Sequence, residues 1–292
     1  MWLAVLALVW AGGVSACQAS VLDPQGPVGA AQKTLIINAA AIMLAIIVPV
    51  IGATIGFAWW FRASNTRAFY RPDWAYSGRI ELAVWSVPLL TIVFLGGIEV
   101  IASYQLDPAR PIESKTKTLE VQVVSLDWKW LFIYPEQGVA SVNQLVVPVG
   151  TPIRFTLTSA SVWNSFFVPQ LGSMIYTMAG MTTQLHLQAD NEGTFQGLST
   201  HFSGDGFSDM NFKVRSVSDD AFADWIRTAG QGGPVLDPDG YRELAKQSIR
   251  DAPSTYRAVA PDLFHQVVMQ VLPPGPGPTG GALPHVMPKG GH

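Results

Sequence analysis

Three apolar stretches without polar alternation occupy the first third of the chain. Residues 2–14 form a short run, Leu35 to Phe61 contains no charged residue, and a further run from Leu82 to Ile98 continues past Glu99. At about 1.5 Å of rise per helical residue, the two longer runs can each cross a hydrocarbon core about 30 Å thick. The pattern therefore predicts a two-helix transmembrane hairpin over residues 35–106, with spans at about 35–61 and 82–103.

Beyond the second span the pattern changes to short alternating segments. Apolar and β-branched residues alternate with polar ones over 119–124, 153–158 and 183–188, and the segments 128–134 and 211–215 are similar. Pro and Gly residues separate these segments, as expected for turns between strands. We therefore predict an all-β sandwich over residues 112–216.

The chain after the predicted sandwich has a helical pattern up to residue 272 and an irregular pattern beyond it. Helices are predicted at 218–229, 239–250 and 261–272, with Ser218 and Asp219 as N-caps of the first. Together they form a C-terminal helical segment over 217–272. The Pro/Gly-rich tail, 273–292, is predicted to be disordered.

The first apolar run is too short to span a bilayer and suits a signal peptide, residues 1–16. It ends in Val-Ser-Ala-Cys, which resembles a bacterial lipobox and predicts lipidation of Cys17, although no Lys or Arg precedes the run. The alternative is an incidental or buried cysteine. Residues 17–34 are predicted to be a periplasmic linker, because they are polar and contain Gly and Pro.

Charge sets the expected orientation of the hairpin. The predicted loop between the spans, 62–81, contains four arginines and few acids. Cytoplasmic loops carry an excess of Lys and Arg, so this loop is predicted to be cytoplasmic and both termini periplasmic. The expected location is the bacterial cell inner membrane.

Composition excludes several classes of function. The 292 residues are 49% hydrophobic and 13% charged, which is too apolar for an ordinary soluble protein. The net charge of −3 argues against nucleic acid as a partner. Cys17 is the only cysteine, which excludes an intrachain disulfide, a zinc finger or an iron–sulfur site, and no cysteine is left for a type-1 copper site in the sandwich.

Five segments carry a resemblance to a known family. They are Glu-Leu-Ala-Val-Trp-Ser-Val-Pro at 81–88, Asp-Trp-Lys-Trp at 127–130, Tyr-Pro-Glu-Gln-Gly at 134–138, Asn-Ser-Phe-Phe-Val-Pro at 164–169, and the loop 199–210. With two spans ahead of a β-domain, they resemble subunit II of the haem–copper respiratory oxidases, and in particular the bo-type ubiquinol oxidases. The resemblance implies a cupredoxin-like Greek-key fold for the sandwich.

The resemblance also implies a lost metal site. Copper-bearing members hold a mixed-valence dicopper centre with a histidine, two cysteines four residues apart, a second histidine and a methionine. Here these positions are Asn164, Ser199, Ser203, Phe207 and Met210. Such a centre depends on soft thiolate donors, which Ser and Phe cannot replace. No metal is therefore expected in this chain, and His201 with Met210 would make too poor a donor set for another.

By the same resemblance, the complex oxidises ubiquinol and reduces oxygen to water with proton translocation. Haem and copper are expected in subunit I, so no catalytic residue is expected in this chain. Its partners would be subunit I, the other membrane subunits and the lipid bilayer, without docking of cytochrome c. The resemblance implies that Glu81 lies at the mouth of a proton pathway. A Glu in the first turn of a helix is, however, also stabilised by the positive end of the helix dipole, without any role in proton transfer.

Several alternatives stay open at this stage. Trp128 and Trp130 align with an electron-entry segment of the copper-bearing relatives, but core packing is the favoured role here. His186 is predicted to face away from the core. At the level of function, the alternatives are a cytochrome c oxidase subunit II and a non-catalytic assembly or scaffold lipoprotein. Copurification with a haem-bearing, multi-span subunit would distinguish these.

Overall fold

The computed structural model describes residues 20–69 and 71–277. The predicted signal peptide, the lipidation at Cys17 and the tail beyond residue 277 lie outside the described residues. The chain divides into two compact units. One is a helical unit of residues 32–107, and the other combines the chain before and after it.

The helical unit is an antiparallel hairpin. Its helices are α2 (Pro27–Trp60) and α3 (Gly78–Gln105), and α2 follows a short 3-10 helix, η1 (Ser20–Leu22). Helix α2 begins with a proline, whose fixed φ suits the first helical position. Residues 27–34, predicted as linker, are therefore helical, and the predicted loop 62–81 ends earlier because α3 begins at Gly78.

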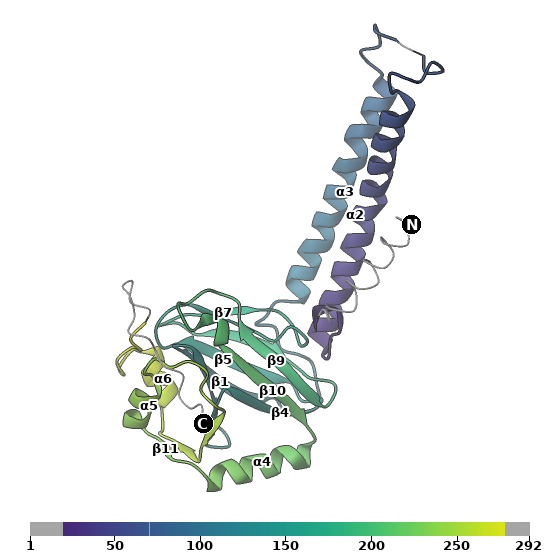
Figure 1. Cartoon of the computed structure of the whole chain (residues 1–292). Coiled ribbons are helices and arrows are strands. Elements are labelled where there is room, and N and C mark those ends of the chain that lie inside the picture. The colour runs from purple at the N-terminus through teal and green to yellow at the C-terminus, as the bar shows by residue number, and fades with distance from the viewer. Residues whose placement is uncertain (1–19, 70, 278–292) are drawn as a thin grey trace, which may run out of the picture. The chain divides into compact units, whose positions relative to one another are not determined.

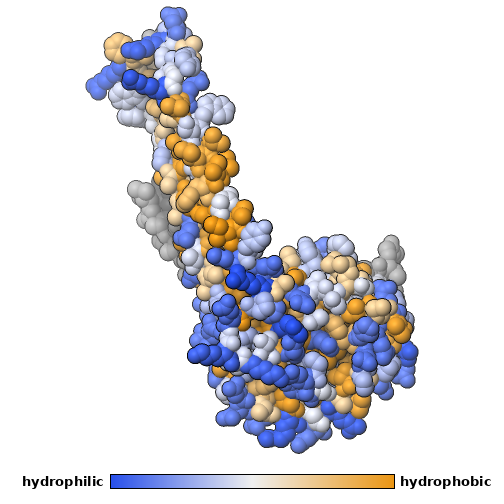
Figure 2. Space-filling model, turned by 180° about the vertical axis from the view of Figure 1, so that it is seen from behind, coloured by the Kyte–Doolittle hydropathy of each residue, from blue (hydrophilic) through white to orange (hydrophobic). Residues whose placement is uncertain are grey.

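The surface of this hairpin is apolar. No residue within the most apolar stretch of either helix is buried, and Figure 2 shows hydrophobic side chains gathered over the helices. Leaving this much apolar area in water would cost about 25 cal/mol per Å². Both helices are long and apolar enough to cross a membrane, and the hairpin provides the chain's membrane anchor.

The other unit is built around a β-sandwich (Figure 1). In spatial order, one sheet contains β12 (Ser254–Tyr256), β3 (Val139–Val142), β2 (Lys129–Tyr134), β1 (Leu119–Leu126), β5 (Ile153–Ser159) and β8 (Thr183–Leu187). The second contains β4 (Gln144–Pro148), β10 (Asn211–Val217), β9 (Gly193–Ser199), β6 (Asn164–Phe167) and β7 (Ile175–Thr177). The chain crosses from one sheet to the other several times, first between β3 and β4 and again on both sides of β5 and of β8. The predicted all-β, cupredoxin-like sandwich is confirmed.

Aromatic rings fill the space between the sheets. Phe166 stacks on Phe212 with ring centroids 5.1 Å apart, and Trp130 meets Phe166 edge-on at 5.4 Å. Trp128 and Trp130 are both buried in this core, which agrees with their predicted packing role. Trp128 lies in the turn before β2 at a positive φ of 105°, and not on the strand.

A second apolar core lies on the outer face of the six-stranded sheet. It is covered by β11 (Val235–Leu236), α5 (Pro238–Leu244), β12, β13 (Ala258–Val259) and α6 (Leu263–Val268) of the C-terminal segment. The first helix of that segment, α4 (Asp219–Gln231), packs instead on the core between the sheets. In the second core, Tyr241 and Phe264 pack against Leu131 and Ile133 of β2. Both faces of β2 are therefore covered, and all six of its residues are buried.

The C-terminal segment departs from prediction in two ways. The helix predicted over 239–250 ends at Leu244, and the segment contributes strands as well as helices. Residues 273–277, predicted as part of a disordered tail, instead bind the sandwich. Gly275 donates its backbone N–H to the Ala160 carbonyl at 3.0 Å, and the Gln247 amide donates to the Gly277 carbonyl at 2.7 Å.

His186 also differs from prediction. It is 5% exposed and therefore does not lie on a solvated face. Its backbone N–H donates to the Pro108 carbonyl at 2.9 Å, and its ring nitrogen Nδ1 lies 3.3 Å from the same oxygen. The segment that leads into the sandwich covers this side of β8, which alternation within the strand cannot reveal.

The residues ahead of α2 are fixed to the same unit. The Gln25 N–H donates to the Gln170 carbonyl at 2.7 Å, and the Gln25 carbonyl accepts from the Asp190 N–H at 2.8 Å. A Cβ atom at Gly26 would lie 2.0 Å from the Gln188 carbonyl oxygen, so this close approach requires glycine. The chain is thus tied to the sandwich immediately before its first long helix.

Candidate functional site

Two of the five positions that the resemblance assigns to a lost dicopper centre meet at one end of the five-stranded sheet. Asn164 begins β6 and Ser199 ends β9, which are neighbouring strands, and both residues are buried. The Ser199 hydroxyl lies 3.4 Å from the Asn164 side-chain oxygen and 3.4 Å from the His201 carbonyl. The two side chains thus contact each other and the backbone, through long and weak hydrogen bonds.

The third position, Ser203, lies in a loop that packs on Trp128. The Trp128 indole N–H donates to the Ser203 carbonyl at 2.9 Å. A Cβ atom at Gly206 would lie 2.4 Å from the indole ring, so only glycine allows this approach. The Ser203 hydroxyl is buried and has no hydrogen-bond partner among the described residues. The indole and the loop backbone hold this part of the site together.

The remaining two positions belong to packing. Phe207 begins the 3-10 helix η2 (Phe207–Asp209), and its ring meets Phe202 edge-on at 5.6 Å. Met210 is 1% exposed and belongs to the core between the sheets. Its carbonyl accepts the Ser199 N–H at 3.1 Å, which fixes the end of the loop to β9.

The donor set at these positions does not suit copper. It consists of an amide, two hydroxyls, a phenyl ring and a buried thioether, with no thiolate and no imidazole. Among the described residues, no group of three or more His, Cys, Asp or Glu side chains could hold a metal ion. His201 is exposed, and its ring packs edge-on against Tyr176 at 5.7 Å. The sequence predicted which five positions correspond to ligands but could not show how their side chains pack.

Exposed aromatic side chains next to the loop 199–210 form a rim that was not predicted from the sequence. It consists of Trp163, Tyr176 and Phe202, which are 57%, 41% and 73% exposed. Trp163 and Tyr176 have ring centroids 6.4 Å apart. Large exposed aromatic side chains gathered in one place are typical of a surface that binds another protein.

The charged residues of the Asp-Trp-Lys-Trp motif secure the C-terminal segment. Asp127 accepts hydrogen bonds from the Ser161 hydroxyl and, at 2.8 Å, from the Gly277 N–H. Lys129 is 3% exposed, and its ammonium lies 3.0 Å from the Asp251 carboxylate and donates to the Lys246 carbonyl at 2.9 Å. The motif was singled out in the sequence for its tryptophans, and this anchoring role was missed.

A buried phenol adjoins the same anchor. Burial, with a smaller contribution from the charge of Asp127, raises the pKa of Tyr241 well above its ordinary value. The Tyr241 side chain therefore stays neutral throughout the physiological pH range. It belongs to the apolar packing beneath α5 and offers no acid–base group.

Glu81 lies in the first turn of α3, where its N–H donates to the Ser77 carbonyl at 3.0 Å. Glu81 is exposed and lines a cavity of about 290 Å³ together with, among others, Trp74, Tyr76 and Trp85. The placement puts an ionisable side chain at the start of a membrane helix. It is compatible both with the predicted proton pathway and with a simple dipole interaction.

Two family models match the chain. Residues 135–217 match the model described as "Cytochrome C oxidase subunit II, periplasmic domain", and residues 231–275 match "COX Aromatic Rich Motif". The second match corresponds to the segment that Asp127 and Lys129 hold against the sandwich. Fold and site together define a membrane-anchored protein of the oxidase subunit II class.

Close relatives define the family more narrowly. The chain is 48% identical over 267 residues to the cytochrome bo(3) ubiquinol oxidase subunit 2 of Pseudomonas aeruginosa, covering 91% of this chain and 80% of the relative. It is 50% identical over 258 residues to the ubiquinol oxidase subunit 2 of Acetobacter aceti, covering 87% and 83%. The chain belongs to the ubiquinol oxidase subunit 2 family and is a subunit of a quinol oxidase complex. The resemblance predicted from the motifs is confirmed.

A solved structure shows a more distant likeness. It is the crystal structure of the periplasmic domain of subunit II of cytochrome oxidase from Bradyrhizobium japonicum. The identity is 27% and the TM-score 0.39, over 42% of this chain and 98% of that one.

Proposed function

We propose that this chain is a structural, redox-inactive subunit of a ubiquinol oxidase that reduces oxygen to water with proton translocation. The observation that carries the proposal is the packing of the five former ligand positions. Ser199 and Asn164 contact each other, Met210 is buried in the core, and a loop on Trp128 encloses Ser203. These groups offer packing and weak hydrogen bonds where a dicopper relay would need thiolates.

The source of electrons explains why such a relay is unnecessary. A water-soluble cytochrome c docks outside the membrane, so its electrons need a carrier to the membrane subunit. Ubiquinol is lipid-soluble and would deliver its two electrons within the bilayer to the haem expected in subunit I, while its two protons are released separately. Two ubiquinol molecules would supply the four electrons that reduce one oxygen molecule to two water molecules, and the four protons needed for the water would be taken up by the complex. This chain then needs no metal, no cofactor and no cytochrome c surface.

Two surfaces support a scaffolding role. The exposed apolar side chains of α2 and α3 must be covered by lipid and by the other membrane subunits. The aromatic rim offers a second contact, because Trp163 and Phe202 are more than half exposed beside the loop. We propose that subunit I covers this rim and that the contact with the sandwich stabilises subunit I.

The proposed orientation follows from the charged loop. The arginine-rich connection between α2 and α3 would lie in the cytoplasm, with the sandwich in the periplasm and Cys17 lipidated at the outer surface of the inner membrane. Labelling of single-cysteine variants in the loop and in the sandwich, from either side of the membrane, would test this orientation.

Copper content tests the redox-inactive role directly. In the purified oxidase, copper is expected only at the level of the subunit I site, and none should remain with this chain after the subunits are separated. The measurement is elemental analysis of copper against haem and protein. Copper bound in stoichiometric amount to the separated chain would contradict the proposal.

Glu81 is proposed to admit protons at the cytoplasmic side. The variant Glu81→Ala is expected to slow ubiquinol-driven oxygen uptake on the order of tenfold, equal to about 1.4 kcal/mol in the barrier, without loss of assembly. Glu99→Ala, in the same helix α3, is the matched control and should keep the wild-type rate. Unchanged turnover in Glu81→Ala, or equal slowing in both variants, would leave only the helix-dipole role.

A further inference from the structure

The loop between α2 and α3 is basic and largely without ionic partners. Four arginines lie in or next to it, against Asp73 alone before α3 begins: Arg62, Arg67, Arg71 and Arg79. None of the four forms an ion pair with a carboxylate within residues 20–69 and 71–277. Their charge is therefore available to an anion from outside the chain.

Arg62 is held in place by the end of α2. Its Nη1 donates to the Trp59 carbonyl at 2.8 Å and its Nε to the Ser64 hydroxyl at 3.0 Å. The guanidinium also lies 5.0 Å from the centre of the Trp59 ring, a cation–π contact. These contacts restrict the side chain without neutralising its charge.

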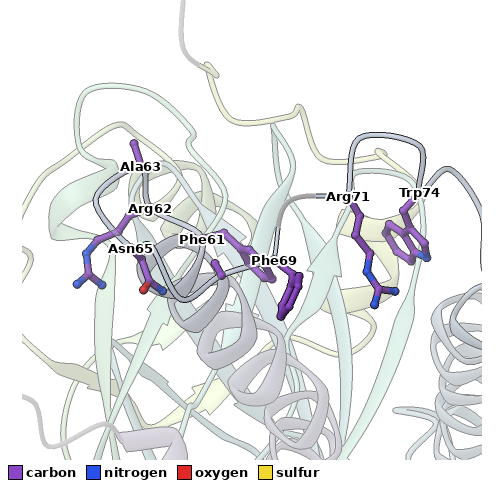
Figure 3. A pocket seen from close by; sticks show the side chains of 8 residues that line it. Phe61, Arg62, Ala63, Asn65, Phe69, Arg71 and Trp74 are labelled. Atoms are coloured by element: carbon purple, nitrogen blue, oxygen red, sulfur yellow. The ribbon is translucent and has the colours of Figure 1, made fainter.

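A cavity of about 730 Å³ opens in this loop. Aromatic rings and cations line it together, chiefly Phe61, Arg62, Asn65, Phe69, Arg71 and Trp74. In Figure 3, Phe61 and Phe69 lie between Arg62 and Arg71, and Arg71 lies beside Trp74. The lining therefore combines an apolar floor with two guanidinium groups.

The position of the cavity along the chain indicates its environment. It begins directly after Trp60, the last residue of α2, and ends shortly before α3. A membrane helix leaves the hydrocarbon at such a point, and aromatic and basic side chains there meet lipid headgroups. Guanidinium groups bind phosphate oxygens through paired N–H donors, more specifically than a point charge does.

We propose that this cavity binds one anionic phospholipid, with its phosphate at Arg71 and its acyl chains against Phe61, Phe69 and the apolar surface of α2, while Arg62 adds positive charge on the other side of the two rings. The aromatic floor favours a lipid over free phosphate, which has no apolar part to bury. The unpaired arginines favour a lipid of net negative charge over a zwitterionic one. The site requires the hairpin to span a membrane, but it does not depend on the redox role of the chain.

Native mass spectrometry of the detergent-purified oxidase tests the site. The delipidated complex is titrated with equal amounts of phosphatidylglycerol and phosphatidylcholine. The wild type is expected to retain one phosphatidylglycerol with a preference on the order of tenfold. The double variant Arg62→Gln/Arg71→Gln should lose that preference while keeping its haem content and its full set of subunits.

The matched control removes the same charge elsewhere. Arg227→Gln/Arg242→Gln breaks two exposed ion pairs outside the hairpin and should retain lipid as the wild type does. If the loop variant retained as much phosphatidylglycerol as the wild type, the proposal would be overturned. A neighbouring subunit that filled the cavity would produce this same result. Loss in the control variant, or displacement of the lipid by inorganic phosphate at equal concentration, would overturn it as well.

Discussion

Oxygen uptake by the oxidase that contains this chain should proceed rapidly with ubiquinol and about a hundredfold more slowly with reduced cytochrome c. A hundredfold difference corresponds to about 2.7 kcal/mol in the effective barrier. The physical reason is the proposed loss of the dicopper centre on β6 and β9, where the resemblance assigns two of its ligand positions to Asn164 and Ser199. If no metal binds there, as proposed, an electron arriving at the sandwich surface has no carrier to the membrane. Polarographic oxygen uptake with each donor at saturating concentration measures the ratio.

The remaining soft donors supply the control for this experiment. Met210→Leu conserves volume in the core, and His201→Ala alters only an exposed ring. Neither should change uptake with ubiquinol. Rapid uptake with cytochrome c, abolished by either substitution, would show that an electron path exists around these two residues and that the site has been misinterpreted.

Asp251→Ala is expected to have the largest effect on stability, about 3–5 kcal/mol. The Lys129 ammonium is buried and lies 3.0 Å from the Asp251 carboxylate. Removing the carboxylate leaves a buried cation without its ionic partner, which costs more than the pair itself contributes. For a domain of this size the melting midpoint should fall by about 2–4 °C per kcal/mol. Thermal unfolding of the full chain in detergent, followed by tryptophan fluorescence, measures the shift.

Two comparisons sharpen this experiment. Asp224→Ala breaks a pair with Arg227 in which both side chains are about two-thirds exposed, and it should cost less than about 1 kcal/mol. The double variant Lys129→Met/Asp251→Ala removes both charges and should recover much of the loss. If Asp251→Ala and Asp224→Ala melted at the same temperature, the buried pair would not be what holds the C-terminal segment in place.

The fold was predictable where the pattern was long and regular. The two helices follow from the length of their apolar runs, and the strands around 119–124, 153–158 and 183–188 follow from alternation. Strands β3, β4, β6 and β7 were missed, because three to five residues are too few to establish an alternation, and the seven-residue β9, which contains two glycines, was missed as well. The start of α2 was placed too late, because residues 27–34 are less apolar than the span although they are helical.

Features of the site that depend on distant contacts were not predictable. Lys129 and Asp251 meet across more than a hundred residues of sequence, and nothing in either neighbourhood indicates the other. The error at His186 has the same origin, since the backbone at Pro108 covers it from outside the strand. The five positions predicted to be former ligands rest on motif spacing, which is a property of sequence, and their ligand ancestry stays a prediction. Their packing is a property of the folded chain.

Strand β12 has a consequence for biosynthesis. It pairs with β3 at the border of the six-stranded sheet, although on the order of a hundred residues separate the two in the chain. During synthesis, the edge of β3 that does not pair with β2 stays unpaired until Ser254 to Tyr256 emerge, on the order of ten seconds at typical rates of synthesis. An unpaired border strand attracts other extended chains. A chain truncated before Ser254 would therefore expose one adhesive strand edge, which proteases and chaperones can recognise before the unfinished subunit joins the oxidase.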